Sequence, residues 1–302
     1  PILATIDVGA LAHNLNRVAR RLADDAPAPA RIWAVIKANA YGHGLEAAVR
    51  GFAAADGLAL LDLDEAVQCR ELGWQRPILL LEGFFKPRDL DVLDHYRIGT
   101  VVHCHAQMDM LAAYPRPAAI DAHVMLNSGM HRLGFQPGEY RGAFDRARAL
   151  QSAGVLGLVG KMTHFARADD DLAVTRAQLE CFSRVAAGLP GPVSVCNSAA
   201  VLAPGLAARM PGEDQWARPG ICLYGASPYV GRDADSLGLL PAMTLGSELI
   251  SVHVLPAGEA IGYGHAFRTD QDMRVGIVAC GYADGYPRHA ITGTPVTVSG
   301  VR

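Results

Sequence analysis

The sequence lacks the features by which several classes of protein are recognised. No apolar run reaches the roughly 20 residues that a membrane-spanning helix needs, and no run of Lys and Arg indicates a nucleic-acid-binding face. The net charge is only −3 over 302 residues. No basic segment followed by an apolar stretch opens the chain, as it would in a signal peptide. We therefore expect a cytoplasmic protein that binds neither membrane nor nucleic acid.

Cysteine is also sparse, and its spacing has no recognisable pattern. The six cysteines lie far apart, without a C-x-x-C pair, which predicts buried thiols in a reducing compartment rather than disulfides. His103-Cys104-His105 is a weak candidate for a metal site. Neighbouring residues on a strand point to opposite faces, and no fourth ligand is close in sequence. We therefore expect no metal.

What the sequence does contain is a regular alternation of apolar runs and amphipathic segments. The runs that predict strands are 32–36, 57–61, 78–82, 99–102, 120–126, 155–163, 193–196 and 215–217. The segments that predict helices are 10–22, which Asp7 could cap, 45–52, 63–72, 141–152 and 172–187. This α/β pattern predicts a (β/α)8 TIM-like barrel over residues 8–230. A doubly wound open sheet is the competitor, but no Gly-x-Gly-x-x-Gly turn follows the first of these strands.

After Tyr229 the pattern changes to strands without helices. Apolar runs at 249–255, 274–280 and 295–298 are separated by Gly, Pro and Asp turns, which predicts a smaller all-β domain over residues 231–302. The strand-like residues 1–7 are expected to join it. Because its pattern of strands stops in mid-course at residues 300–302, we expect this β domain to be incomplete at the C-terminus.

Lys37 follows the apolar run at 32–36 directly, and the glycines Gly42 and Gly44 come soon after it. At the carboxyl end of a barrel strand its amine would point into a pocket. Burial there lowers the pKa of an amine, and the neutral amine can form a Schiff base with an aldehyde. A lone lysine at a strand end could equally extend to water, so other motifs must decide.

Seven segments together resemble fold-type III pyridoxal-phosphate (PLP) enzymes, and most closely the alanine racemase family. They are 33–44, 127–135, 163–166, 196–200, 218–225, 262–264 and 281–286. They follow the family's order and span nearly the whole chain. The resemblance implies a PLP-dependent isomerase that interconverts L- and D-alanine and supplies D-alanine for peptidoglycan.

The resemblance also implies roles for individual residues. Lys37 would hold PLP and act as one catalytic base, while Tyr263 would be the second base on the opposite face of the substrate. Tyr263 would come from the other subunit of a homodimer. Arg132 would bind the substrate carboxylate, and Arg218 would donate a hydrogen bond to the ring nitrogen of PLP. The other cofactor-binding residues implied are Tyr41, His164, Asn197, Ser198, Gly220 and Ile221.

One departure from the family pattern leaves alternatives open. Many relatives have a carbamylated lysine at the position of Met125, and that lysine braces the substrate arginine. In this chain Asn127 or a bound anion could brace Arg132 instead. A broad-specificity amino-acid racemase is therefore one alternative function. A non-catalytic PLP-binding barrel protein is another, although a β domain that carries Tyr263 argues against it.

Overall fold

The computed structural model describes residues 2–25, 30–115, 117–207 and 214–301. The chain divides into two compact units. One consists of Ile6–Ala242, and the other combines Pro1–Thr5 with Met243–Arg302. The division falls later than the predicted boundary at 230/231. The segment just before it packs on the first helix, where the Asn14 side chain accepts a hydrogen bond from the backbone N–H of Leu240 (2.8 Å).

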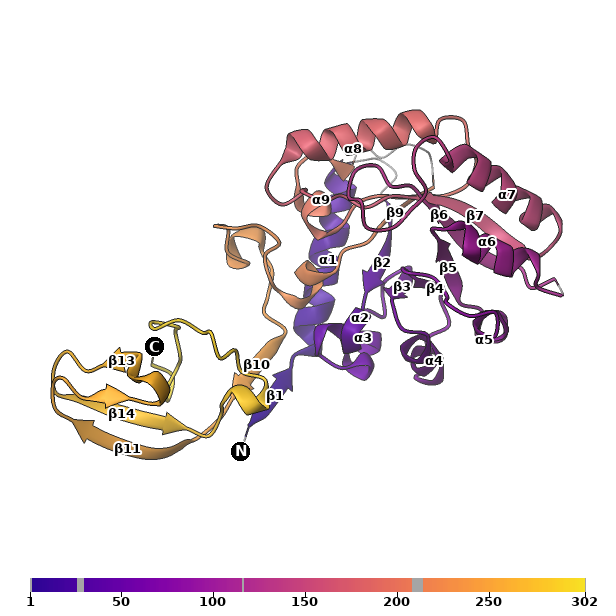
Figure 1. Ribbon diagram of the computed structural model, residues 1–302. Coiled ribbons are helices and arrows are strands. Elements are labelled where there is room, and N and C mark those ends of the chain that lie inside the picture. Colours follow the sequence, from indigo (N-terminus) through magenta and orange to yellow (C-terminus); the bar gives the residue numbers. More distant parts are fainter. Residues whose placement is uncertain (1, 26–29, 116, 208–213, 302) are drawn as a thin grey trace. The chain divides into compact units, whose positions relative to one another are not determined.

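The larger unit is a closed barrel of parallel strands in the order β2 to β9, with helices around it (Figure 1). The strands are β2 (Arg31–Val35), β3 (Gly57–Leu60), β4 (Ile78–Leu80), β5 (Gly99–Val102), β6 (Ile120–Met125), β7 (Leu156–Met162), β8 (Val193–Ser194) and β9 (Gln215–Ala217). Pairing of β2 with β9, with Arg31 opposite Trp216, closes the barrel. The predicted TIM-like barrel is thus confirmed, strand by strand.

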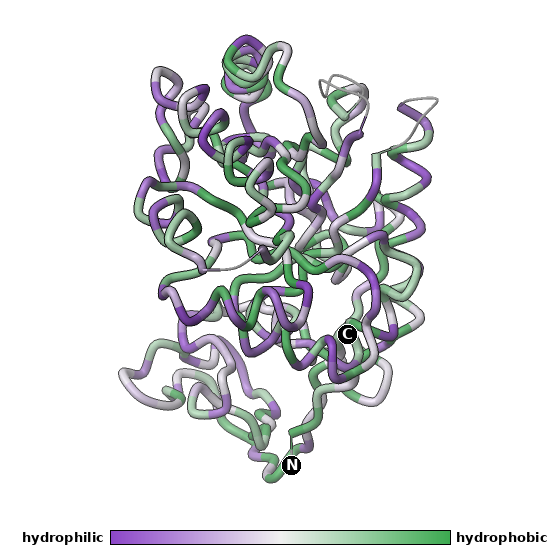
Figure 2. Tube along the Cα trace, turned by 90° about the vertical axis from the view of Figure 1, so that its right-hand side faces the viewer, coloured by the Kyte–Doolittle hydropathy of each residue, from purple (hydrophilic) through white to green (hydrophobic). Residues whose placement is uncertain are grey.

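The helices alternate with these strands. They are α1 (Val8–Asp25), α2 (Lys37–Tyr41), α3 (Leu45–Gly51), α4 (Leu63–Glu71), α5 (Asp89–Tyr96), α6 (His105–Ala112), α7 (Tyr140–Ser152), α8 (Leu172–Val185) and α9 (Ser198–Leu202). Asp7 caps α1 as predicted, because its Oδ1 accepts a hydrogen bond from the N–H of Ala10 (3.0 Å). Hydrophobic and hydrophilic stretches alternate along the helices, as expected when each buries one face (Figure 2). None of the helices in the described part of the chain is long and apolar enough to cross a bilayer.

Two apolar layers hold the barrel together. One fills the lumen with inward-facing side chains of the strands, namely Trp33, Val35, Ala59, Leu79, Val101, Met125, Met162 and Trp216. The other lies between the strands and the helices. This is the usual packing of a parallel barrel, in which the lumen is a filled core and the carboxyl ends of the strands are left for function.

The smaller unit is built of short antiparallel pairs. β1 (Leu3–Ile6) pairs with β10 (Met243–Gly246), β11 (Leu249–Leu255) with β14 (Met273–Val278), and β12 (Ala260–Ile261) with β13 (Phe267–Arg268). The predicted strand at 295–298 is wrong. Val298 only bridges to Val301 around a tight turn, and Pro295 has no N–H to donate to a ladder.

Candidate active site

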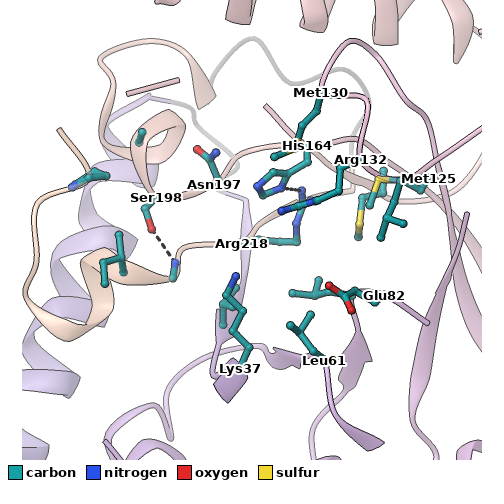
Figure 3. Close-up of a pocket in the computed structure, with 18 of the residues that line it drawn as sticks. Lys37, Leu61, Glu82, Met125, Met130, Arg132, His164, Asn197, Ser198 and Arg218 are labelled. Atoms are coloured by element: carbon teal, nitrogen blue, oxygen red, sulfur yellow. Dashed lines mark hydrogen bonds between the residues drawn. The ribbon is translucent and has the colours of Figure 1, made fainter. Parts of the chain in front are cut away.

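A cavity of about 310 Å³ lies at the carboxyl ends of the barrel strands (Figure 3). Its lining includes nine of the residues that the sequence singled out: Lys37, Tyr41, Arg132, His164, Asn197, Ser198, Arg218, Gly220 and Ile221. The carboxyl ends of parallel strands meet at one edge of a barrel, so residues far apart in sequence converge there. Tyr263 belongs to the other unit, where it opens the 3₁₀ turn η4 (Tyr263–His265) and is 92% exposed.

Lys37 is followed by an unusual left-handed turn. Ala38, Asn39, Ala40 and Tyr41 all have φ between 51° and 54°, a conformation that costs roughly 1–2 kcal/mol for each residue with a Cβ. A turn of this kind persists only if its surroundings hold it in place. The turn redirects the chain at the end of β2. Lys37 lies directly before the left-handed residues and lines the cavity.

Glu65 of α4 holds that turn. Its Oε1 accepts a hydrogen bond of 2.7 Å from the backbone N–H of Asn39, and the Asn39 side chain in turn accepts one from the N–H of Leu45 (3.1 Å). The sequence did not reveal this role. Asp62-x-x-Glu65 has the spacing of a capping box, in which the glutamate would bond back to its own helix. Here only Asp62 caps α4.

We expect Glu65→Ala to lower any activity that depends on Lys37 about tenfold or more, because a charge-assisted hydrogen bond worth roughly 1.5–3 kcal/mol would no longer hold the turn that places Lys37. Glu65→Gln keeps an acceptor oxygen and should lose much less. Steady-state kinetics and thermal unfolding of both variants test this. Glu71→Ala, at the exposed end of the same helix, is the matched control. Equal losses in the Ala and Gln variants would contradict the role.

Arg218 is buried and pairs with the half-buried His164. Arg218 donates from Nη1 to Ser194 Oγ (2.5 Å) and from Nη2 to the carbonyl of Thr163 (2.6 Å). Nη2 also lies 3.1 Å from His164 Nδ1. Burial lowers the pKa of Arg218 to about 10, so the guanidinium remains charged at neutral pH. These bonds fix its orientation in the cavity.

His164 is neutral at physiological pH. Burial, and then the charges of Arg218, Arg132 and Lys37, lower the pKa of its imidazole to about 3. Because Nδ1 faces a guanidinium that can only donate, Nδ1 must accept, and the proton therefore lies on Nε2. His164 thus offers a hydrogen-bond donor, not a charge, on its other side.

The depressed pKa of His164 predicts acid sensitivity. The unfolded chain takes up this proton near pH 6.5 and the folded chain only near pH 3, so stability falls as pH drops between these values. At pH 5 we expect a loss of roughly 2 kcal/mol from this group. In denaturant unfolding, the loss of unfolding free energy between pH 7 and pH 5 should be about 2 kcal/mol smaller for His164→Asn than for the parent. His253→Asn, at an exposed histidine, should follow the parent.

Backbone donors gather beside Ser198, where α9 begins. The N–H groups of Gly220 and Cys222 lie 2.8 and 3.5 Å from Ser198 Oγ. A Cβ on residue 220 would come within 2.5 Å of the Tyr41 hydroxyl, so a larger residue there would have to displace the Tyr41 side chain. Ile221 opens the 3₁₀ turn η2 (Ile221–Tyr224), whose first N–H groups have no partner within the turn. Donors collected in this way suit an anion such as a phosphate.

Two aromatic residues and an asparagine complete this part of the site. Burial raises the pKa of Tyr41 to about 12, which keeps its hydroxyl protonated as a donor. The Tyr41 ring packs 4.7 Å from that of Tyr224, whose hydroxyl donates to the carbonyl of Val35 (2.9 Å). Asn197 caps α9 by accepting from the N–H of Ala200 (3.1 Å). The cradle is therefore fixed from several sides.

Arg132 has an exposed side chain and lies beside His164 and Arg218 (Figure 3). Its guanidinium has no hydrogen-bond or ion-pair partner among the described residues. Asn127 does not brace it: the Asn127 side chain accepts from the N–H groups of Gly129 and His131 (3.2 and 2.9 Å) and so orders the preceding loop. Met125 is buried in the lumen. A free guanidinium at the mouth of the cavity suits a carboxylate.

The barrel and the donor set at its carboxyl end place the chain in the class of barrel-type PLP-dependent enzymes. Family models described as "Alanine racemase, N-terminal domain" and "Alanine racemase, C-terminal domain" match residues 6–228 and 242–302. The chain belongs to the alanine racemase family, and it is a PLP-dependent isomerase.

Individual relatives agree with this assignment. An alanine racemase from Bordetella petrii is 58% identical over the whole chain and 82% of its own length, and one from Ralstonia nicotianae is 51% identical over the whole chain and 78% of its own length. The crystal structure of the biosynthetic alanine racemase from Pseudomonas aeruginosa superposes with a TM-score of 0.89 at 38% identity. That comparison covers 98% of this chain and 79% of the other.

Proposed function

We propose that the protein racemises alanine with PLP, using Lys37 and Tyr263 as bases on opposite faces of the substrate. The observation that carries this proposal is the convergence of Lys37, Arg218 and the Ser198–Gly220 cradle on one cavity. The residues fit the cofactor, because the cradle supplies donors for a phosphate and the glycine at residue 220 avoids a close contact between a Cβ and the Tyr41 hydroxyl. When bound, PLP withdraws electrons from the substrate Cα and makes its proton acidic.

The residues of this chain would divide the remaining work. Arg132 binds the substrate carboxylate and orients the Cα. Arg218 donates to the ring nitrogen of the cofactor and cannot give up its proton. The Lys37 amine removes or returns the α-proton on one face, and the Tyr263 phenol does so on the other. His164 keeps Arg218 in place through the 3.1 Å contact.

We propose that the enzyme is a homodimer in which Tyr263 serves the pocket of the partner subunit. Two apolar side chains, Val252 (48% exposed) and Val254 (74%), point to one face of β11. Apolar side chains left exposed together on one strand face are typical of a protein interface. This face therefore supports association of two copies through the β unit.

A racemisation assay over alanine, serine, lysine and arginine tests the proposed function. We expect alanine to have the highest kcat/KM. Lys37→Ala, purified in the same way, is the control for contaminating racemases. Comparable rates on lysine or arginine would favour the broad-specificity alternative, which rests on Met125 at the position where many relatives have a carbamylated lysine. Absence of turnover with every substrate, despite bound PLP, would favour a non-catalytic protein.

The biological role that we propose is the supply of D-alanine for peptidoglycan. A bacterial strain that requires D-alanine for growth should grow without it when it expresses the parent chain. The same strain should still require D-alanine when it expresses Lys37→Ala. Growth with both chains would show that the rescue does not depend on this site.

A further inference from the structure

A second cavity, of about 740 Å³, opens at the amino ends of the barrel strands, opposite the active site. Its lining comes from the first residues of several strands, among them Arg31 and Trp33 of β2, Asp121 of β6 and Trp216 of β9. None of the residues given a role in racemisation takes part in it. In barrels of this kind the amino end normally serves stability alone, so a cavity this large requires an explanation.

One wall of the cavity is a stack of three planar groups. The rings of Trp33 and Trp216 lie 4.2 Å apart at an angle of 23°, and the Arg31 guanidinium lies 4.2 Å above the Trp216 ring. A Cβ at Gly57 would come within 2.2 Å of the Trp33 ring, so glycine makes the room that the indole needs. Both indoles are only 5% exposed, and Trp33 and Arg31 cover the two faces of the Trp216 ring. The stack therefore meets the cavity with apolar ring edges and a charged outer end.

The floor of the cavity contains polar groups that the protein does not satisfy. His123 is 3% exposed, and neither of its ring nitrogens has a hydrogen-bond partner among the described residues. The indole Nε1 of Trp33 is also buried and has no hydrogen-bond partner among the described residues. Burial lowers the pKa of His123 to about 3, so the neutral ring offers one donor and one acceptor. A buried unpaired polar group costs roughly 1–3 kcal/mol, which favours a partner that is not part of the chain.

The rim of the cavity is positively charged. Arg97 is exposed, and its guanidinium has no partner within the described residues. The nearby Arg70 donates only to backbone carbonyls, such as those of Tyr96 and Trp74 (both 2.8 Å). On the acidic side, Asp214 pairs with Arg31, and Asp121 accepts from the N–H of Leu158 (2.8 Å). Burial raises the pKa of that aspartate. Arginine charge therefore exceeds carboxylate charge, which favours an anion.

We propose that this cavity binds a small aromatic carboxylate that carries a hydroxyl at its far end. The carboxylate pairs with Arg97 at the rim, and the aromatic body packs edge-to-face against the ring edges of Trp33 and Trp216. The hydroxyl, which both donates and accepts, reaches His123 on the floor. Each part of the ligand thus has one partner in the cavity: the carboxylate has Arg97, the aromatic body has the two indoles and the hydroxyl has His123.

Isothermal titration of the PLP-loaded protein with 4-hydroxybenzoate tests the proposal. We expect saturable binding, weaker binding of benzoate, which lacks the hydroxyl, and no detectable binding of 4-hydroxybenzamide, which lacks the charge. Tryptophan fluorescence gives a second readout, because Trp33 and Trp216 are two of the three tryptophans in the chain. No saturable binding at millimolar ligand, or equal binding of the amide, overturns the proposal.

Matched variants locate the site. Arg97→Ala should weaken 4-hydroxybenzoate binding about tenfold or more, since a charge-assisted contact is lost, while Arg20→Ala, at an exposed arginine of α1, should leave it unchanged. Arg132→Ala should also leave it unchanged. If Arg132→Ala abolishes binding and Arg97→Ala does not, the carboxylate occupies the substrate site and the proposal fails.

His123→Phe tests the contact with the ligand hydroxyl. This variant should bind benzoate and 4-hydroxybenzoate equally. If it does not fold, the variants at Arg97 and Arg132 still decide the question.

Discussion

Replacing Lys37 by alanine is expected to remove both covalently held PLP and racemase activity. The chain has three lysines, Lys37, Lys86 and Lys161, and only Lys37 lines the active-site cavity. Lys161 donates to the carbonyls of Leu189 and Pro190 from the strand β7. Loss of a catalytic base alone typically costs 10²–10⁴-fold in rate, so the activity of Lys37→Ala should fall at least that far.

Absorbance and chemical trapping make this prediction specific. Borohydride reduction of the PLP-loaded parent should attach the pyridoxyl group to Lys37, as shown by peptide mapping. Lys37→Ala should lose the absorbance of lysine-bound PLP, and Lys86→Ala should keep it. Label on Lys86 or Lys161 in the parent would show that the cofactor is held elsewhere.

Tyr263→Phe is expected to keep the cofactor but lose about 10²–10⁴-fold in racemisation, because one of the two bases is missing. The lysine side of the site would still exchange a proton. Exchange of the α-proton with heavy water should therefore slow much more for one enantiomer of alanine than for the other. Equal slowing for both enantiomers would argue against two bases on opposite faces.

Mixing two inactive variants tests whether Tyr263 acts across a dimer. A heterodimer of Lys37→Ala and Tyr263→Phe contains one site with both residues intact only if the tyrosine comes from the partner. Random exchange of subunits should then restore about a quarter of the parent activity, because half of the dimers carry one intact site of two. No recovery after confirmed exchange would place the tyrosine in the same subunit as its lysine, or show that the protein is not a dimer.

The barrel could be predicted from the sequence because each strand is buried and therefore reads as an apolar run. The carboxyl ends of such strands share one edge, which is why segments around Lys37, His164 and Arg218 could be expected to meet. Helices α5 and α6 gave no clear pattern. α5 alternates leucines and aspartates over barely two turns, too short for a helical period to stand out.

Other parts of the site lie beyond what local patterns encode. Four consecutive left-handed residues after Lys37 contain no glycine, so nothing in their composition predicts that backbone. Glu65 supports this turn through a tertiary hydrogen bond. Its spacing from Asp62 predicted a local capping box instead. The unpaired state of Arg132 and the orphaned nitrogens of His123 are likewise properties of the assembled barrel. The prediction of a strand at 295–298 was wrong because a strand also needs a neighbouring strand to pair with, and Val298 bridges only to Val301.

The close approach of the Tyr41 hydroxyl to Gly220 has a consequence for the evolution of resistance to inhibitors. Every one-base change in a glycine codon that alters the amino acid introduces at least a Cβ, and here that atom would collide with the hydroxyl at 2.5 Å. A variant that escapes a compound anchored on the N–H of residue 220 would therefore have to move the Tyr41 ring, which is part of the cradle. Escape by a change at Arg132, which is exposed, would remove the proposed contact with the substrate carboxylate.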